Sequence, residues 1–141
     1  MRNEYPAARA WLSRSKVLAD DIRRKKARIR NLREASERIT AQVTDMPRTP
    51  SPNNHRMDDL VARIVELEGE VREAELELKS VCADMVIRLD EHLKPEHATI
   101  LNLRYVQFLS WTAIINQMSY SRSKVLDLHH EALASLDKIL R

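Results

Sequence analysis

Three prolines within six residues, Pro47, Pro50 and Pro52, divide the first two thirds of this 141-residue chain into two long amphipathic stretches. Proline lacks an amide proton and its ring collides with the preceding helical turn, so no single helix runs through this segment. On both sides of it, apolar residues recur at alternating spacings of three and four. Before the prolines they are Trp11, Leu18, Ile22, Ile29, Leu32, Ile39 and Val43, and after them Met57, Leu60, Ile64, Leu67, Val71, Ala74, Leu78, Val81 and Met85. This pattern predicts two helices that each bury a narrow seam.

The two stretches carry opposite charge. Residues 1–38 hold twelve Lys and Arg against five Asp and Glu, whereas residues 57–96 hold five against twelve. Each stretch is long enough for a helix of roughly 60 Å. Equal lengths and opposite charges together predict an antiparallel coiled-coil hairpin over residues 1–94, with a loop at residues 45–56. Lys25 and Ser36 fall at seam positions, where polar residues fix the register and lower stability.

The basic residues Arg23, Arg24, Lys25, Lys26, Arg28 and Arg30 form a cluster in the first stretch. We expect these residues to face the acidic second stretch and to set the pairing of the two helices. Contact with nucleic-acid phosphates is the alternative.

The composition favours an all-α protein. The chain has a single glycine, 4% aromatic residues and 32% charged residues, which leaves little material for sheets. No apolar run approaches the length of a membrane span, and the N-terminus lacks the apolar core of a signal peptide. Cys82 is the only cysteine, so a disulfide framework is excluded. A cytoplasmic protein without membrane contact is expected.

The pattern of apolar and capping residues over residues 95–141 predicts a second domain of three short helices. Pro95 favours the start of a helix that runs roughly over residues 96–106. Two further helices are expected over residues 110–118 and 121–140, with Ser110 and Ser121 as N-caps. Their apolar faces are Trp111, Ile114, Ile115 and Met118 in the first, and Val125, Leu128, Ala132, Leu136 and Ile139 in the second. Helices joined by so short a turn must cross steeply, which is the helix-turn-helix geometry.

In a helix-turn-helix the second helix meets DNA through its N-terminal end. The apolar face of residues 121–140 leaves the polar side chains outward, so the candidate DNA-contacting residues are Ser121, Arg122, Ser123, Lys124, Asp127 and His130, together with Thr112 of the preceding helix. Arg122 and Lys124 are suited to phosphate or guanine, and Ser123 to phosphate or base. Asp127 is suited to accept from a cytosine amino group or to orient a neighbouring cation.

Other chemistry has little support in the sequence. His129 and His130 are adjacent, so on a helix their side chains diverge by about 100° and do not chelate one ion as an i, i+4 pair does. His129 is expected against the core and His130 near the DNA face. Ser13 and Ser15 lack an oriented base and an oxyanion turn. We therefore expect no catalytic residue, no metal and no cofactor.

The C-terminal segments resemble region 4 of bacterial sigma factors, in which a helix-turn-helix reads promoter DNA. The residues that carry this likeness are Leu103-Arg104-Tyr105, Ser110-Trp111-Thr112-Ala113-Ile114, Tyr120-Ser121, Val125 and Leu128-His129-His130-Glu131-Ala132-Leu133. With Thr44-Asp45-Met46-Pro47-Arg48 and Ile64-Val65-Glu66-Leu67-Glu68 included, the chain is similar to phage and prophage regulators of the RinA and ArpU kind. The resemblance implies a transcriptional regulator of phage or prophage genes that binds double-stranded DNA.

Two positions depart from that pattern. Phe108 stands where such proteins often have glycine before the first helix of the motif, so either the turn is reshaped or Phe108 packs into the core. Ile115 replaces a small residue, which is expected to widen the crossing of the two helices.

The hairpin is expected to supply a second surface, either for a homodimer or for RNA polymerase. Two other functions stay open: a small terminase subunit of a phage packaging machine, and a non-enzymatic coiled-coil adaptor.

Overall fold

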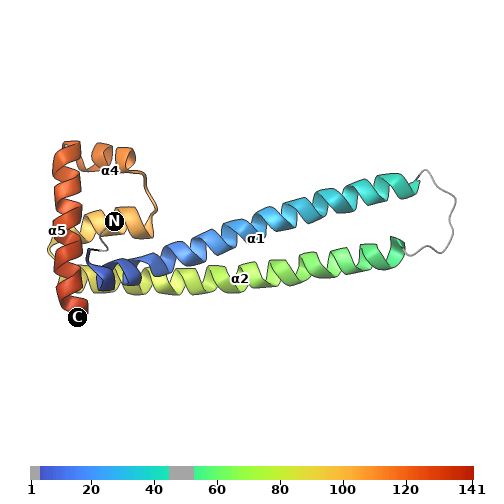
Figure 1. The fold of residues 1–141 in the computed structure, drawn as a ribbon, viewed down its shortest axis with the longest axis horizontal. Coiled ribbons are helices and arrows are strands. Elements are labelled where there is room, and N and C mark those ends of the chain that lie inside the picture. Colours follow the sequence, from blue (N-terminus) through green and yellow to red (C-terminus); the bar gives the residue numbers. More distant parts are fainter. Residues whose placement is uncertain (1–3, 45–52) are drawn as a thin grey trace. The chain divides into compact units, whose positions relative to one another are not determined.

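The computed structural model describes residues 4–44 and 53–141. Over these residues the regular elements are all helical: α1 (Pro6–Thr44), α2 (Asn53–His92), α3 (Pro95–Leu101), the π-helix η1 (Asn102–Val106), α4 (Trp111–Met118) and α5 (Arg122–Leu140). The predicted all-α class, with a long antiparallel helical hairpin followed by a helix-turn-helix, is confirmed (Figure 1). In the same residues no helix combines the length and the apolar character needed to cross a membrane.

The predicted loop at residues 45–56 is too long at its C-terminal end. Helix α2 begins at Asn53, so residues 53–56 are helical, while residues 45–52 lie outside the described part of the chain. No proline stands between Pro52 and Pro95, and the backbone is therefore free to become helical directly after Pro52.

Contacts divide the chain into two compact units. The hairpin unit consists of residues 18–77, and the terminal unit combines residues 1–17 with residues 78–141. The boundary expected between residues 94 and 95 falls inside the terminal unit. A domain formed by residues 95–141 alone therefore stays a prediction.

In the hairpin unit, α1 and α2 run side by side in opposite directions (Figure 1). Their buried seam consists of Ile22, Ile29 and Leu32 from α1, and Ile64, Leu67, Val71 and Ala74 from α2. Two cross-arm contacts establish the antiparallel order: Arg33 pairs with Glu68 at 3.3 Å, and the Ser36 hydroxyl donates to the Met57 sulfur at 3.5 Å. Ser36 therefore occupies the seam position that its spacing predicts.

The basic cluster follows our expectation only in part: Lys26 and Arg30 line a groove with Glu68 and Glu75 of α2, whereas other members pair within α1. Arg23 pairs with Asp20, and Arg24 and Lys25 pair with Asp21 at 3.7 and 3.0 Å, so these cations are bound by carboxylates of their own helix. The hydrogen bond to Asp21 is also the main cause that raises the pKa of Lys25. Carboxylates three or four residues before a cation lie on the same helix face and need no partner arm.

The core of the terminal unit is built by the ends of both long helices together with the short ones. Its buried apolar residues are Ala8, Leu12, Met85, Leu89, Ala98, Ile100, Leu101, Leu103, Ile114, Val125, Leu128, Ala132, Leu133 and Leu136. Sequence spacing predicted most of the α5 face but not Leu133, and Ile139 is 44% exposed, so its place in that face was wrong. Leu133 is buried because α5 packs on more than one side.

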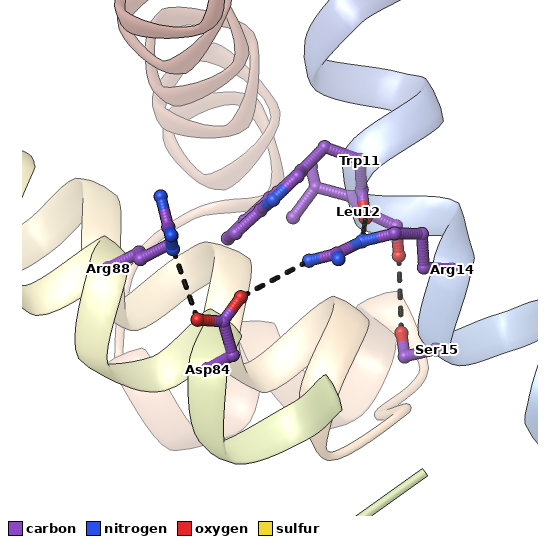
Figure 2. Close-up of polar contacts among 6 residues, drawn as sticks. All are labelled: Trp11, Leu12, Arg14, Ser15, Asp84 and Arg88. Atoms are coloured by element: carbon purple, nitrogen blue, oxygen red, sulfur yellow. Dashed lines mark hydrogen bonds and ion pairs between the residues drawn. The ribbon is translucent and has the colours of Figure 1, made fainter. Parts of the chain in front are cut away.

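Polar contacts hold the start of α1 within this unit. The Asp84 carboxylate accepts from Arg88 at 3.0 Å and pairs with Arg14 at 3.6 Å (Figure 2). The hydrogen bond from Arg88 is the main cause of the lowered pKa of Asp84. The buried Ser15 hydroxyl is shared between the carbonyl oxygens of Leu12 at 3.1 Å and Tyr105 at 2.7 Å. Ser15 therefore ties α1 to η1, and its role is structural.

Candidate nucleic-acid interface

A turn of three residues, 119–121, joins α4 to α5, and α4 crosses α5 instead of running along it (Figure 1). Ser119 closes α4 in the left-handed conformation at φ 59°, with its amide bound to the Ile115 carbonyl. The Ser110 hydroxyl accepts from the Ala113 amide at 3.2 Å, and the Ser121 hydroxyl accepts from the Lys124 amide at 3.2 Å. Both predicted N-caps are therefore confirmed, and they fix where α4 and α5 begin.

The first turn of α5 is open to solvent. Arg122, Ser123 and Lys124 are all exposed. The Ser121 cap satisfies only the Lys124 amide, so the amides of Arg122 and Ser123 have no partner within the helix. Among the described residues, no carboxylate pairs with Arg122 or Lys124. Free amides, the positive end of the helix dipole and two unpaired cations together form a surface that favours anions.

Lys124 is held over an aromatic ring. Its Nζ lies 4.3 Å from the centre of the Tyr120 ring, in the last residue before the α5 cap. The Tyr120 hydroxyl donates to Glu96 Oε1 at 2.9 Å, and this bond is the main cause that raises the pKa of Tyr120. The ring is thereby fixed from α3, and the Lys124 amine is kept close to the turn while its other side faces solvent. The contact between Tyr120 and Lys124 was not predicted from the sequence. An aromatic residue four positions before a lysine is the pattern that could have indicated it.

Three further exposed residues lie in α4 and in the second turn of α5. Thr112 is exposed in the first turn of α4, and Asp127 is exposed in the second turn of α5. Leu126, next to Asp127 in the sequence, is an apolar side chain that is 39% exposed. It was not predicted from the sequence as a site residue. Its signal was available, because the buried pair Val125 and Leu128 leaves position 126 facing outward.

His130 is exposed, as expected, but it already has partners. Its Nε2 lies 2.9 Å from the Tyr5 hydroxyl and 3.8 Å from the Glu4 carboxylate, and the two rings meet edge to face at 5.1 Å. His130 stands six residues beyond Lys124, or about 9 Å along the helix axis. The structure therefore places it against the N-terminal segment and apart from the first turn of α5.

His129 lies on the opposite side, against the core, as its neighbour's exposure requires. Its Nε2 is 2.7 Å from the Tyr105 hydroxyl, its ring stacks on Tyr105, and the Trp111 ring meets it edge-on at 4.7 Å. Burial, reinforced by the charges of Arg9 and Arg104, lowers the pKa of His129 to about 4. The ring is therefore neutral at pH 7 and serves to pack α5 against η1 and α4.

The turn before α4 keeps the conformation that glycine usually supplies. Phe108 has φ 57°, and its side chain is 42% exposed, so it neither reshapes the turn nor packs into the core, contrary to both expectations. Arg104 compensates: its Nη1 donates to the Leu109 carbonyl at 2.9 Å and its guanidinium lies 4.6 Å from the Trp111 ring centre. A long side chain from η1 thus fixes a turn in which a non-glycine residue is strained.

Metal ligands do not gather in the described residues, where no group of three His, Cys, Asp or Glu side chains is arranged to hold an ion. Cys82 is half-buried, and burial raises the pKa of its thiol. A thiol in that environment is less reactive than an exposed one.

Comparison with known proteins leaves the residues themselves as the only argument for function. No family model, no curated protein and no solved structure matches this chain.

Proposed function

We propose that this protein is a non-enzymatic, DNA-binding transcriptional regulator of phage or prophage genes. In this proposal the first turn of α5 enters the major groove of promoter DNA, while the hairpin unit contacts a second copy or RNA polymerase. The single observation that supports it most is the exposed first turn of a capped α5, which carries Arg122 and Lys124 without carboxylate partners.

The proposed DNA contact of each residue follows from its position in α4 or α5. Arg122 and the free amides of the first turn suit a phosphate or the guanine edge, and Ser123 suits either. Leu126 supplies an apolar contact of the kind that recognises the thymine methyl group, and Asp127 accepts from cytosine or orients Arg122. In the same proposal, exposed Thr112 of α4 contacts the DNA backbone. His130, which is bound to Tyr5, contributes less than the first-turn residues.

The decisive experiment measures binding of the full chain to a labelled random-sequence double-stranded DNA library at several salt concentrations. Arg122→Ala and Lys124→Ala should each weaken binding, and loss of one phosphate contact should reduce the slope of log K against log salt by about one unit. Lys138→Ala is the matched control, because Lys138 is an exposed cation in the last turn of the same helix. If the control weakens binding as much as the two variants, α5 does not contact DNA through its N-terminal end.

Regulation is tested separately, with sites selected from that library placed upstream of a reporter and transcribed by purified RNA polymerase. A change in transcript level that Arg122→Ala abolishes supports the regulator. A ring of many subunits that stimulates a packaging ATPase would instead support the small terminase subunit. A chain that binds no DNA even at low salt would support the non-enzymatic coiled-coil adaptor.

A further inference from the structure

The first turn of α5 carries its two cations on opposite flanks. Successive residues of an α-helix are rotated by about 100°, so Arg122 and Lys124 stand roughly 160° apart around the axis. Val125 is fully buried, and Ser123, two positions before it, therefore points almost directly away from the core. Asp127 follows Ser123 by four residues and shares its exposed side. Ser123 and Asp127 thus occupy the middle of the exposed face, between the two cations.

The flank of α5 that carries Lys124 faces α3. Glu131 stands seven residues, or about two turns, after Lys124 and therefore on the same side of the helix. The Glu131 carboxylate lies 3.5 Å from His97 Nε2 of α3. One end of the same flank is supported by Tyr120, whose ring lies under the Lys124 amine and whose hydroxyl donates to Glu96 of α3 at 2.9 Å. Helix α3 therefore fixes the ring on which the Lys124 amine rests.

An aromatic ring holds an ammonium group without neutralising it. The attraction comes from the quadrupole of the ring, so the amine keeps its full charge. Lys124 Nζ lies 4.3 Å from the centre of the Tyr120 ring, and no carboxylate among the described residues pairs with it. To immobilise a long side chain on binding costs roughly two- to tenfold in affinity. A lysine that is already held in place avoids part of that loss and remains available to an anion.

The flank position of Lys124 fits a phosphate. The major groove of DNA is about 12 Å wide, and a helix with its side chains is about 10–12 Å across. The flanks of an inserted helix therefore face the phosphate backbones, and its central outward residues face the base edges. The place of Asp127 agrees with this orientation, because a carboxylate on a flank would be repelled by phosphate, whereas at the centre it accepts from a cytosine amino group.

We propose that Lys124 contacts a DNA phosphate and that Tyr120 is the positioning residue that holds its amine ready for this contact. Arg122, on the opposite flank, contacts the phosphates of the other strand. The preferred bases are then determined by Ser123 and Asp127. These roles rest on the proposed function and deepen it, because they separate the residues that give α5 its affinity from those that give it sequence preference.

Binding of the full chain to a duplex selected from the random-sequence DNA library tests the role of Tyr120. Tyr120→Leu removes the ring and should weaken binding about two- to tenfold, whereas Tyr120→Phe keeps the ring and should weaken it less. In a Lys124→Ala chain, Tyr120→Leu should cause no further loss, because the amine that it positions is absent. An equal loss in both backgrounds would overturn the positioning role.

Proton NMR of the free chain tests the same contact without DNA. The ε-methylene protons of Lys124 lie near the face of the Tyr120 ring, so the ring current should shift them upfield. Tyr120→Phe should keep this shift and Tyr120→Leu should remove it. Lys124 protons at their ordinary positions in the wild-type chain would overturn the placement of the amine.

Repeated selection from the random-sequence library tests the separation of flank from centre. Lys124→Ala should keep the base preference of the wild-type chain and reduce the slope of log K against log salt by about one unit. Ser123→Ala and Asp127→Asn should each lower discrimination about tenfold at one base pair. A changed base preference in Lys124→Ala overturns this inference and leaves the proposed function standing. A wild-type chain that binds no DNA overturns the proposed function and this inference together.

Discussion

The Asp137 carboxylate accepts a hydrogen bond from the backbone amide of Ala8 at 3.1 Å, across 129 positions of sequence. Asp137 lies near the end of α5 and is buried, and its second oxygen binds Arg141 Nε at 3.1 Å. Ala8 is in the first turn of α1, where amides lack partners within the helix. A residue from the end of the chain thus performs the capping role that a neighbouring serine performs for α4 and α5.

We predict that Asp137→Ala lowers the free energy of unfolding by about 1–3 kcal/mol, because it leaves a buried amide without an acceptor. Asp137→Asn should cost less, since the amide carbonyl still accepts from Ala8 while the ion pair with Arg141 is lost. Urea unfolding of the full chain measures both, with the exposed Asp127→Ala as control. Equal stability of Asp137→Ala and wild type would show that the cap contributes nothing.

We predict that the terminal unit loses stability as the pH falls from 6.5 to 4. The pKa of His129 is lowered in the folded chain to about 4 from its ordinary 6.5, so between these values the unfolded chain binds the extra proton. The contribution is therefore complete above pH 6.5 and lost toward pH 4, and we expect about 1–2 kcal/mol after allowance for partial exposure. The contribution of Asp84, whose pKa is also lowered, is complete above its ordinary 3.8 and is lost only at still lower pH.

Thermal unfolding at pH 7 and pH 4.5 checks this pH dependence. His129→Phe keeps an aromatic ring against Tyr105 and Trp111 and should flatten the pH dependence. His55→Gln, an exposed position in the hairpin unit, should leave it unaltered. A profile that His129→Phe does not change would assign the pH dependence to other groups.

We predict opposite outcomes for the neighbouring substitutions Val125→Asp and Leu126→Asp. Val125 is fully buried, so an aspartate there places an unpaired charge in the core and unfolds the terminal unit. Leu126 is 39% exposed, so its variant should fold normally and lose affinity for DNA through repulsion of phosphate. Circular dichroism and the DNA-binding assay separate the two effects. Normal DNA binding by a folded Leu126→Asp chain would remove this part of α5 from the interface.

We predict that a fragment of residues 95–141 does not unfold cooperatively. Its core would lack Ala8, Leu12, Met85 and Leu89, which are all almost completely buried in the full chain. A chain that joins residues 1–17 to residues 78–141 through a flexible linker should recover the transition, because it restores every member of that core. A sharp thermal transition in the short fragment alone would show that the long helices are dispensable.

Local signals predicted much of this structure and long-range contacts account for what was missed. Pro95, Ser110 and Ser121 act within one turn of their own positions, so their roles follow from the sequence. The pairing of Lys25 with Asp21 is equally local, and the spacing of four residues indicates it. Our expectation relied instead on the net charges of the two long stretches, which do not show which residues pair. The role of Asp137 depends on α1, more than 100 residues away, and no pattern within α5 indicates it.

In the candidate interface, too, local features were predicted from the sequence and long-range contacts were not. Spacing identified Arg122, Ser123 and Lys124, because their exposure follows from the buried face of one helix. The contacts of His130 with Tyr5 and of Tyr120 with Glu96 join distant elements, and only the folded chain brings them together.

The bond between Ala8 and Asp137 also determines when the protein can finish folding during synthesis. A ribosome delivers the chain from its N-terminus, so the first turn of α1 has no acceptor until Asp137, 129 residues later, has been made. The hairpin unit, residues 18–77, is complete much earlier and is able to close first. Synthesis that stops before Asp137 would therefore leave the first turn of α1 without its acceptor.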